Sequence, residues 1–182
     1  MATLVADGRI RRSDRILDVG CGTGTDALLL AGWGFRVVGV DPDRRAVASA
    51  RTRATRYGLS DRVRFHVGGA EDLPALFPRQ RFDVVLHTLV ANNLRRGVAK
   101  HFRGVAAVMR PDGLLVLHER IVRRDAGAPP GRIRPLAGVV RHFWVSPSVT
   151  TQLAEHADPR GPPFAHVALW LGTPRRPAGR RP

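Results

Sequence analysis

The sequence predicts an α/β protein with a doubly wound, mostly parallel sheet and an antiparallel final strand. Short runs of Val, Leu and Ile alternate with helical patterns along the first two thirds of the chain. Nearly continuous apolar strands of this kind are typical of parallel sheets covered on both faces. A glycine-rich turn also follows the first apolar run directly, and ligands of doubly wound sheets bind at such turns.

Hydrophobic periodicity predicts three strands and two helices in the first part of the chain. In the second helix, Ala46, Ala50, Ala54 and Tyr57 form one stripe, and Asp43 is the expected N-cap. The predicted elements are a strand at 15–19, a helix at 25–33, a strand at 35–40, a helix at 43–57 and a strand at 63–67.

The middle of the chain predicts a helix between two further strands. Val98, Phe102, Val105 and Met109 share one face of this helix. Asp112-Gly113 predicts a turn before the fifth strand. The predicted ranges are 82–86 for the fourth strand, 95–109 for the helix and 114–117 for the fifth strand.

The pattern loosens in the last third of the chain. Gly, Pro and Arg dominate one stretch, which predicts a long loop, and four Arg with three Pro predict a disordered basic tail. The turn before the final strand leaves little room for a sixth strand, so we expect a shortened sheet edge. The predicted ranges are 123–140 for the loop, 147–157 for a short helix, 158–163 for the turn, 166–171 for the final strand and 173–182 for the tail.

Composition indicates one soluble domain. The chain has 182 residues, of which 43% are hydrophobic and 25% charged, close to the averages of globular domains. The longest apolar run, residues 27–31, is too short to span a bilayer. The N-terminus lacks a basic segment followed by an apolar one, and a single cysteine fits a reducing compartment. We therefore expect a cytoplasmic protein.

The charge is strongly basic, at +15, and Lys100 is the only lysine among 30 basic residues. The excess is uneven, because residues 1–91 carry a net +4 and residues 92–182 a net +11. An acidic partner near the second half is one interpretation. A solvated, arginine-biased surface is the other.

The strongest motif is Asp18-Val19-Gly20-Cys21-Gly22-Thr23-Gly24, at the end of the first predicted strand. Glycines there let the backbone turn tightly and approach a ligand, and the following helix N-terminus favours negative charge. A turn of this kind alone also fits a nicotinamide or flavin site. Asp41, at the end of the second strand, can accept hydrogen bonds from ribose hydroxyls, and helix capping is the alternative role.

Five blocks together resemble the class I S-adenosylmethionine-dependent methyltransferases, which have a Rossmann-like fold. The resemblance covers about residues 10–120, and the later part is loosely similar to the tellurite and thiopurine methyltransferase type. The blocks are Ile16 to Gly24, Val38-Gly39-Val40-Asp41, Gly69-Ala70-Glu71-Asp72-Leu73-Pro74, Phe82-Asp83-Val84-Val85 and Met109-Arg110-Pro111-Asp112-Gly113. The resemblance implies one methyltransferase domain at 1–172, with a cofactor half at about 10–120 and a substrate-side half at 121–172.

The resemblance also implies a role for each cofactor-binding position. Asp18 holds the methionine amino end, the glycine turn lines the carboxylate and ribose, and Asp41 binds the ribose hydroxyls. The third block departs from the family's usual Asp-Ala, so the adenine contact falls to the Ala70 backbone or to Glu71. The implied S-adenosyl-L-methionine-binding residues are Asp18, Gly20, Cys21, Gly22, Gly24, Asp41, Pro42, Ala70, Glu71 and His87.

The acceptor is expected to be a small molecule, with no metal, because no metal-ligand spacing appears. The candidates for a general base are His87, His118 and His142; His66, His101, His156 and His166 are interpreted as structural. Phe143 and Trp144 lie beside the last candidate in a predicted loop.

Alternatives to a small-molecule acceptor remain open. RNA or protein as the acceptor fits the basic charge. However, enzymes that methylate base amino groups usually hold the flipped base with an Asn/Asp-Pro-Pro-aromatic element, and this element is missing after the fourth strand. A non-catalytic S-adenosylmethionine-binding subunit fits the missing adenine-binding acid and the thin lid, but the intact glycine turn and Asp41 argue against it. A hydride-transfer enzyme leaves the third and fifth blocks unexplained. The segment before Ile16 is too short for a long lid, so the substrate site is open or completed by a second subunit of a homo-oligomer.

Overall fold

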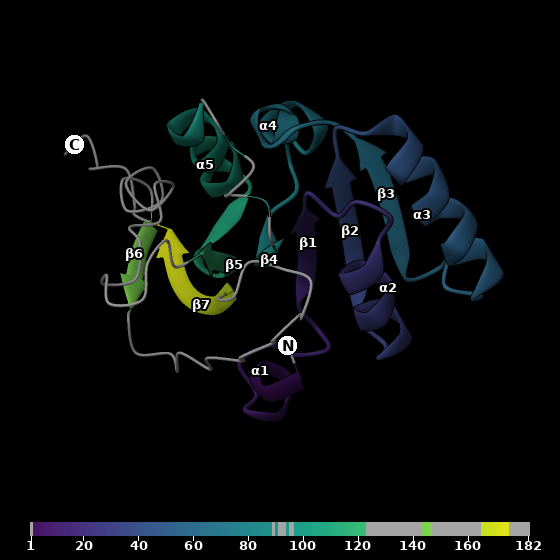
Figure 1. Cartoon of the computed structure of the whole chain (residues 1–182). Coiled ribbons are helices and arrows are strands. Elements are labelled where there is room, and N and C mark those ends of the chain that lie inside the picture. The colour runs from purple at the N-terminus through teal and green to yellow at the C-terminus, as the bar shows by residue number, and fades with distance from the viewer. Residues whose placement is uncertain are drawn as a thin grey trace.

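The computed structural model describes residues 2–88, 90, 94, 97–122, 143–146 and 165–174, with side chains described from Leu4 to Leu117 within these ranges. These residues form a seven-stranded sheet in the order β3-β2-β1-β4-β5-β7-β6 (Figure 1). The strands are β1 Arg15–Val19, β2 Arg36–Asp41, β3 Val63–Val67, β4 Phe82–Thr88, β5 Met109–Val122, β6 Phe143–Ser146 and β7 Ala165–Pro174.

The first five strands are parallel, in the order 3-2-1-4-5. β7 pairs antiparallel with β5, and β6 pairs antiparallel with β7. The predicted fold class, including its antiparallel final strand, is confirmed.

Helices cover both faces of the parallel part. The helices are α1 Ala2–Ala6, α2 Thr25–Gly32, α3 Arg44–Arg56, the 3₁₀ turn η1 Ala70–Asp72, α4 Leu73–Leu76 and α5 Val98–Ala107. α2 and α3 pack through Leu30 and Val47 into one apolar cluster. α4 and α5 pack through Leu73 and Phe102 into a second. The sheet therefore lies between two apolar layers, as expected for a doubly wound fold.

The apolar stripe of α3 differs from the predicted one. Val47, Ala50 and Ala54 are the buried residues of the helix, whereas Tyr57 lies beyond the last helical residue and is 56% exposed. The spacing of three and then four residues also follows the helical period, and it brings the larger valine side chain onto the sheet in place of Ala46.

β5 is longer than predicted and irregular near its start. Phe82 pairs with Met109, but Val84 pairs with Leu114, so residues 110–113 lie opposite Asp83 alone. The predicted turn at Asp112-Gly113 is therefore part of a bulge within the strand. At the other end β5 reaches Val122, which places His118 inside the strand, although we predicted that it follows the strand.

The sixth strand, β6, lies at residues 143–146, before the predicted turn at 158–163 where room for it was expected to be short. β6 includes Phe143 and Trp144, which were predicted in a loop, and it pairs along the outer edge of β7, with Val145 opposite Gly172. An antiparallel β7 beside β5 leaves an open edge, and a four-residue strand is sufficient to cover part of it. β7 also runs to Pro174, past the predicted strand end, and residues 175–182 of the predicted tail lie outside the described residues.

Gly104 allows α5 to approach η1 closely. A Cβ at Gly104 would lie 2.0 Å from the backbone oxygen of Ala70, so Gly104→Ala would push the backbones of α5 and η1 apart. We expect a loss of about 1–3 kcal/mol in the free energy of unfolding, measured by urea denaturation, although alanine is the better helix former.

Gly32, at the end of α2, is the matched control. A Cβ there meets nothing within 4 Å, so Gly32→Ala is expected to stabilise the protein by roughly 0.5–1 kcal/mol. Equal effects of the two substitutions would contradict the close contact between α5 and η1.

Candidate functional site

Three segments meet at the carboxyl edge of the sheet. The turn after β1 is held to β2, because the Gly20 backbone N–H donates to the Val40 carbonyl at 2.8 Å. The segment after β3 is held to the same strand, because the Gly68 N–H donates to the Asp41 carbonyl at 3.0 Å. The glycine turn, Asp41 and the third sequence block therefore share one edge, as expected for a doubly wound ligand site.

Glycine stands at the three motif positions, 20, 22 and 24, for different local reasons. All three have positive φ, which disfavours side chains. A Cβ at Gly20 would lie 2.3 Å from Val90 Cγ2, and one at Gly24 would lie 2.7 Å from Phe65 Cζ. A Cβ at Gly22 meets nothing within 4 Å. The first and third glycines thus serve the protein's own packing, whereas the middle one leaves open space beside the turn.

Asp41 joins the glycine turn to the start of α3. Its Oδ2 accepts from the Gly22 N–H and its Oδ1 from the Asp43 N–H, both at 2.8 Å. Asp43 itself caps α3, accepting from the Arg45 N–H at 2.8 Å, which confirms the predicted cap. Asp41 is half-buried, and its carboxylate retains lone pairs for further donors. The exposed Pro42 lies between the two aspartates.

Asp18 is a buried acid with an unsatisfied oxygen. The residue is 2% exposed, and its Oδ2 has no hydrogen-bond partner among the described residues. Burial raises the pKa of Asp18 to about 7; the charges of Asp26 and Asp41 add to the rise, and a backbone hydrogen bond from Ala27 opposes it. A cationic donor at this position would satisfy the oxygen and favour the ionised form.

Cys21 lies within the glycine turn and is buried. Its thiol donates to the Gly22 carbonyl at 3.8 Å. Burial raises the pKa of the thiol, and the nearby carboxylates of Asp18 and Asp41 raise it further. This thiol therefore resists forming the thiolate that nucleophilic catalysis requires.

Glu71 lies where the third block lacks its acid. Ala70 is buried and Glu71 exposed. The Gly69 N–H donates to Asp72 Oδ2 at 2.9 Å, which fixes the turn. The Glu71 carboxylate oxygens lie 3.0 and 3.3 Å from the point that a Cβ at Gly69 would occupy. An acidic group is thus present beside position 69 even though that residue is glycine.

His87 and His101 form a buried pair that the sequence analysis missed. Their Nε2 atoms lie 2.8 Å apart, between β4 and α5, and Phe102 packs against both rings. The residues are 0% and 6% exposed. Burial, together with the neighbouring His87, lowers the pKa of His101 to about 3, so the His101 imidazole is neutral at pH 7 and shares one hydrogen bond with His87. The available signal was His101 beside Phe102 on the apolar face of the predicted helix.

The other base candidates are not brought to the glycine turn by any described contact. His118 lies in β5, and its side chain is not among those described. His142 lies outside the described residues. Within the described part of the chain, no three His, Cys, Asp or Glu side chains gather into a metal site. Helices of that part are all too short or too polar to cross a membrane.

Comparison with known proteins identifies a family whose match includes the residues at the carboxyl edge of the sheet. Residues 16–113, more than half of the chain, match the family model described as "Methyltransferase domain". The uncharacterized methyltransferase YcgJ of Bacillus subtilis is 31% identical over 125 residues, covering 69% of this chain and 48% of its own. Its crystal structure matches 68% of this chain and 51% of that chain with a TM-score of 0.59.

Two further proteins are similar over parts of the chain. Ubiquinone biosynthesis O-methyltransferase of Bradyrhizobium diazoefficiens is 33% identical over 103 residues, covering 57% of this chain and 38% of its own. A TehB-like methyltransferase structure from Corynebacterium glutamicum matches with a TM-score of 0.65 at 21% identity, over 96% of this chain and 86% of that one, which shows a shared fold.

The chain spans less than half the length of the two curated relatives. The family model nevertheless covers residues 16–113, which hold all five sequence blocks from β1 to the bulge of β5. That match includes the buried Asp18, the glycine turn that follows it, and Asp41 at the end of β2. The chain therefore belongs to the class I S-adenosylmethionine-dependent methyltransferase family.

Proposed function

We propose that this protein transfers a methyl group from S-adenosylmethionine to a small-molecule acceptor. The observation that carries the proposal is the unsatisfied, buried oxygen of Asp18 beside a glycine turn that Asp41 holds in place. When bound, S-adenosylmethionine supplies a methyl group on a positively charged sulfur, and an acceptor atom displaces that sulfur.

The residues at this edge fit such a cofactor. Asp18 offers a buried carboxylate oxygen to an ammonium group, and the open space at Gly22 lets a ligand approach the backbone. Asp41 retains acceptor capacity for two ribose hydroxyls. We assign the remaining contacts to the backbone or side chains of Gly20, Cys21, Gly24, Pro42, Ala70, Glu71 and His87.

The chain's own contribution to methyl transfer is positioning and the exclusion of water. The glycine turn, with its positive-φ glycines and the hydrogen bond from the Gly22 N–H to Asp41, supplies a fixed wall for the cofactor. We assign no proton transfer to the His87 imidazole, because it is fully buried and its Nε2 is engaged by His101.

Two features favour a small acceptor over a nucleobase. Methylation of a pyrimidine carbon requires a cysteine nucleophile, and Cys21, the only cysteine, is buried with a raised pKa. The residues at the end of β4 are His87 and Thr88, not the element that holds a flipped base. Ubiquinone biosynthesis O-methyltransferase, a relative with a small-molecule acceptor by name, supports the same class.

RNA is the second candidate. A tRNA U34 carboxymethyltransferase of Cellvibrio japonicus is 33% identical over 143 residues, covering 76% of this chain and 42% of its own. That likeness extends past the end of the family match into the second half of the chain. The two candidate acceptors, a small molecule and RNA, can be distinguished by which fraction of a cell extract the protein labels.

Incubation with methyl-tritiated S-adenosylmethionine and a fractionated cell extract is expected to label the small-molecule fraction. Asp41→Asn is expected to weaken S-adenosylmethionine binding roughly ten- to hundredfold, since hydrogen bonds to a charged acceptor contribute about 1.5–3 kcal/mol, and to abolish labelling. Calorimetric titration with S-adenosylmethionine and S-adenosylhomocysteine, with NADH as a negative control, measures the binding.

Asparagine at position 41 retains one acceptor oxygen, so it can keep one of the two hydrogen bonds from Gly22 and Asp43 and loses the other together with the charge. Asp43→Asn is the matched control, because asparagine is an equally good helix cap, and it should leave binding unchanged. Nuclease-sensitive label in the RNA fraction would overturn the small-molecule assignment. Absence of cofactor binding would overturn the methyltransferase activity of this chain.

Glu71 is predicted to replace the adenine-binding acid. Glu71→Ala should weaken S-adenosylmethionine binding about fivefold, the equivalent of roughly 1 kcal/mol for one hydrogen bond. Adding Gly69→Asp to Glu71→Ala should restore the affinity, because the acid is then supplied from position 69. Calorimetry on the wild type and both variants measures this, with Asp72 unchanged throughout. If the double variant binds no better than Glu71→Ala alone, the prediction that Glu71 replaces the acid missing at position 69 is wrong.

Asp18 is predicted to make both stability and cofactor binding depend on pH. The pKa of Asp18 in the folded protein, about 7, lies above its ordinary value of 3.8, so its contribution to stability is greatest at low pH and is lost as the pH rises from about 4 to 7. The melting temperature of Asp18→Asn relative to wild type should therefore rise between pH 5 and pH 8.

Cofactor binding should show the opposite trend. An ammonium group binds the ionised carboxylate, so wild-type affinity for S-adenosylmethionine should increase as the pH rises through 7, and Asp18→Asn should bind weakly at every pH. A constant difference in melting temperature between wild type and Asp18→Asn from pH 5 to pH 8 would contradict the raised pKa.

A further inference from the structure

The amino edge of the sheet, opposite the candidate cofactor site, carries a row of arginines. Arg15 begins β1 and Arg36 begins β2, and the two are paired in register. Arg62 comes just before β3, and its carbonyl accepts from the Val37 N–H at 2.9 Å, which puts it next in the row. Arg81 precedes β4, and Arg110 lies at the start of β5. Every parallel strand thus has an arginine at its first residue or directly beside it.

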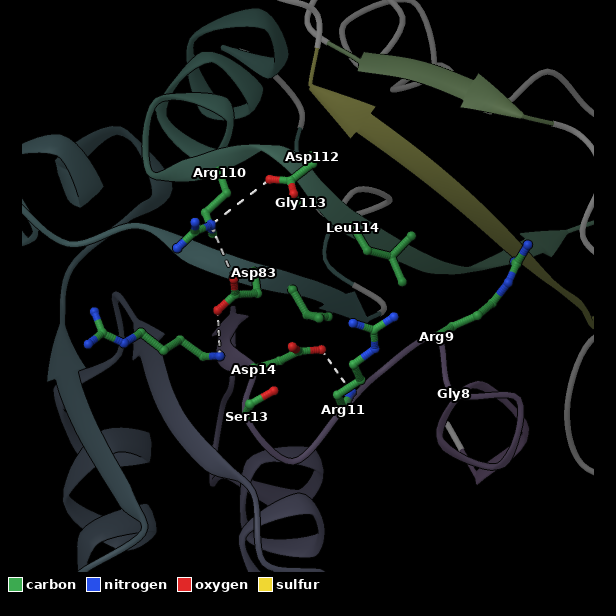
Figure 2. A pocket seen from close by; sticks show the side chains of 12 residues that line it. Gly8, Arg9, Arg11, Ser13, Asp14, Asp83, Arg110, Asp112, Gly113 and Leu114 are labelled. Atoms are coloured by element: carbon green, nitrogen blue, oxygen red, sulfur yellow. Dashed lines mark hydrogen bonds and ion pairs between the residues drawn. The ribbon is translucent and has the colours of Figure 1, made fainter.

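The N-terminal segment adds three more arginines to this edge. Figure 2 shows Arg9 and Arg11 on one side of a cavity and Arg110, from β5, on the other. The cavity has a volume of about 830 Å³. Arg12, from the same segment, donates to the Trp33 carbonyl. Figure 1 shows α1, which precedes this segment, below the amino ends of the strands.

The carboxylates at this edge are fewer and are already engaged in part. Asp83 accepts from the Arg15 N–H at 2.8 Å and pairs with Arg110 at 3.3 Å. Asp14 accepts from the Arg11 N–H at 2.8 Å, and Asp112 lies 3.9 Å from Arg110. Asp61, beside Arg62, is exposed. Because two of these bonds go to backbone N–H groups, they leave the positive charge of the Arg11 and Arg15 side chains in place.

The arginine charges of the row remain largely unneutralised. Among the described residues, the ion pairs at this edge are those of Arg110. The guanidinium groups of Arg62 and Arg81 donate to carbonyl oxygens, which do not cancel their charge. Those of Arg11, Arg15 and Arg36 are exposed, and no described residue accepts from them. Neighbouring strands lie about 4.8 Å apart, so the row is a line of positive charge across the sheet.

We propose that this amino edge binds the phosphate backbone of a single-stranded nucleic acid. Guanidinium groups bind phosphate oxygens in a bidentate manner, and a regular line of charge matches a regular polyanion better than a single small anion. The described part of the chain places one helix at this edge, α1, which has five residues and no basic side chain to enter a duplex groove. The line of cations therefore favours a single strand. Contacts of this kind read the backbone and not the base sequence, so binding is expected to be independent of sequence.

The test compares two triple variants of the same charge. The edge variant is Arg11→Gln, Arg15→Gln and Arg36→Gln; the control variant is Arg64→Gln, Lys100→Gln and Arg103→Gln, three exposed residues of β3 and α5. Each loses three charges, and no described hydrogen bond uses any of these six side chains. Fluorescence anisotropy with a labelled 20-nucleotide single-stranded RNA of mixed sequence measures affinity between 50 and 200 mM salt.

The edge variant should bind the RNA roughly tenfold or more weakly, and its log–log salt slope should be shallower by about 2, as expected for three lost contacts to a single strand. The control variant should stay within about threefold of wild type. S-adenosylmethionine affinity should be the same in all three proteins, which also shows that the variants fold and separates this proposal from that of methyl transfer.

Three results would overturn the proposal. Equal losses in both variants would assign the effect to net charge alone. Full competition by inorganic pyrophosphate together with equal affinity for 4- and 20-nucleotide RNA would assign the edge to a small anion. Tighter binding of a 20-base-pair duplex than of the single strand would assign it to double-stranded nucleic acid.

Discussion

The Asp41 carboxylate is the contact on which the candidate site depends. Its two oxygens hold the N–H groups of Gly22 and Asp43 at 2.8 Å, so one side chain at the end of β2 fixes both the turn after β1 and the start of α3. A carboxylate can accept these bonds and still offer lone pairs to a ligand. The same group therefore shapes the turn in the protein and remains available to a ligand.

The two edges of the sheet differ in their charged groups. The carboxyl edge gathers Asp18, Asp41, Asp43 and Glu71, with Arg53 donating to the Thr23 carbonyl of the glycine turn at 2.8 Å, and the amino edge carries the arginine row beside Asp14, Asp83 and Asp112. Carboxylates close together raise each other's pKa, which is part of the reason that the pKa of Asp18 lies near 7. An acidic edge suits a cofactor that carries ammonium and sulfonium charges, whereas a row of guanidinium groups suits phosphates. A strongly basic protein can thus hold a cationic cofactor, because its charge is divided between the edges.

Sequence reasoning was most successful where a local pattern decides the structure. The ranges predicted for β1 and β3 agree with the structure, and the cap at Asp43 agrees as well, because strand hydrophobicity and helix capping are short-range effects. It was less successful where partners far apart in sequence decide. The bulge of β5 depends on pairing with β4, β6 depends on the free edge of β7, and the contact of Gly104 with Ala70 depends on the packing of α5 against η1.

Local sequence patterns were enough to predict the parallel α/β class, the glycine turn and the acids that flank it, because strand periodicity and glycine spacing are local and the family's blocks are contiguous. Which side chains meet depends on the tertiary structure. It brought His87 against His101 across 14 positions of sequence, turned the Glu71 carboxylate toward the position above Gly69, and aligned Arg15 with Arg36 through strand register. Such pairings depend on the packing of elements in three dimensions, and no single stretch of sequence encodes them.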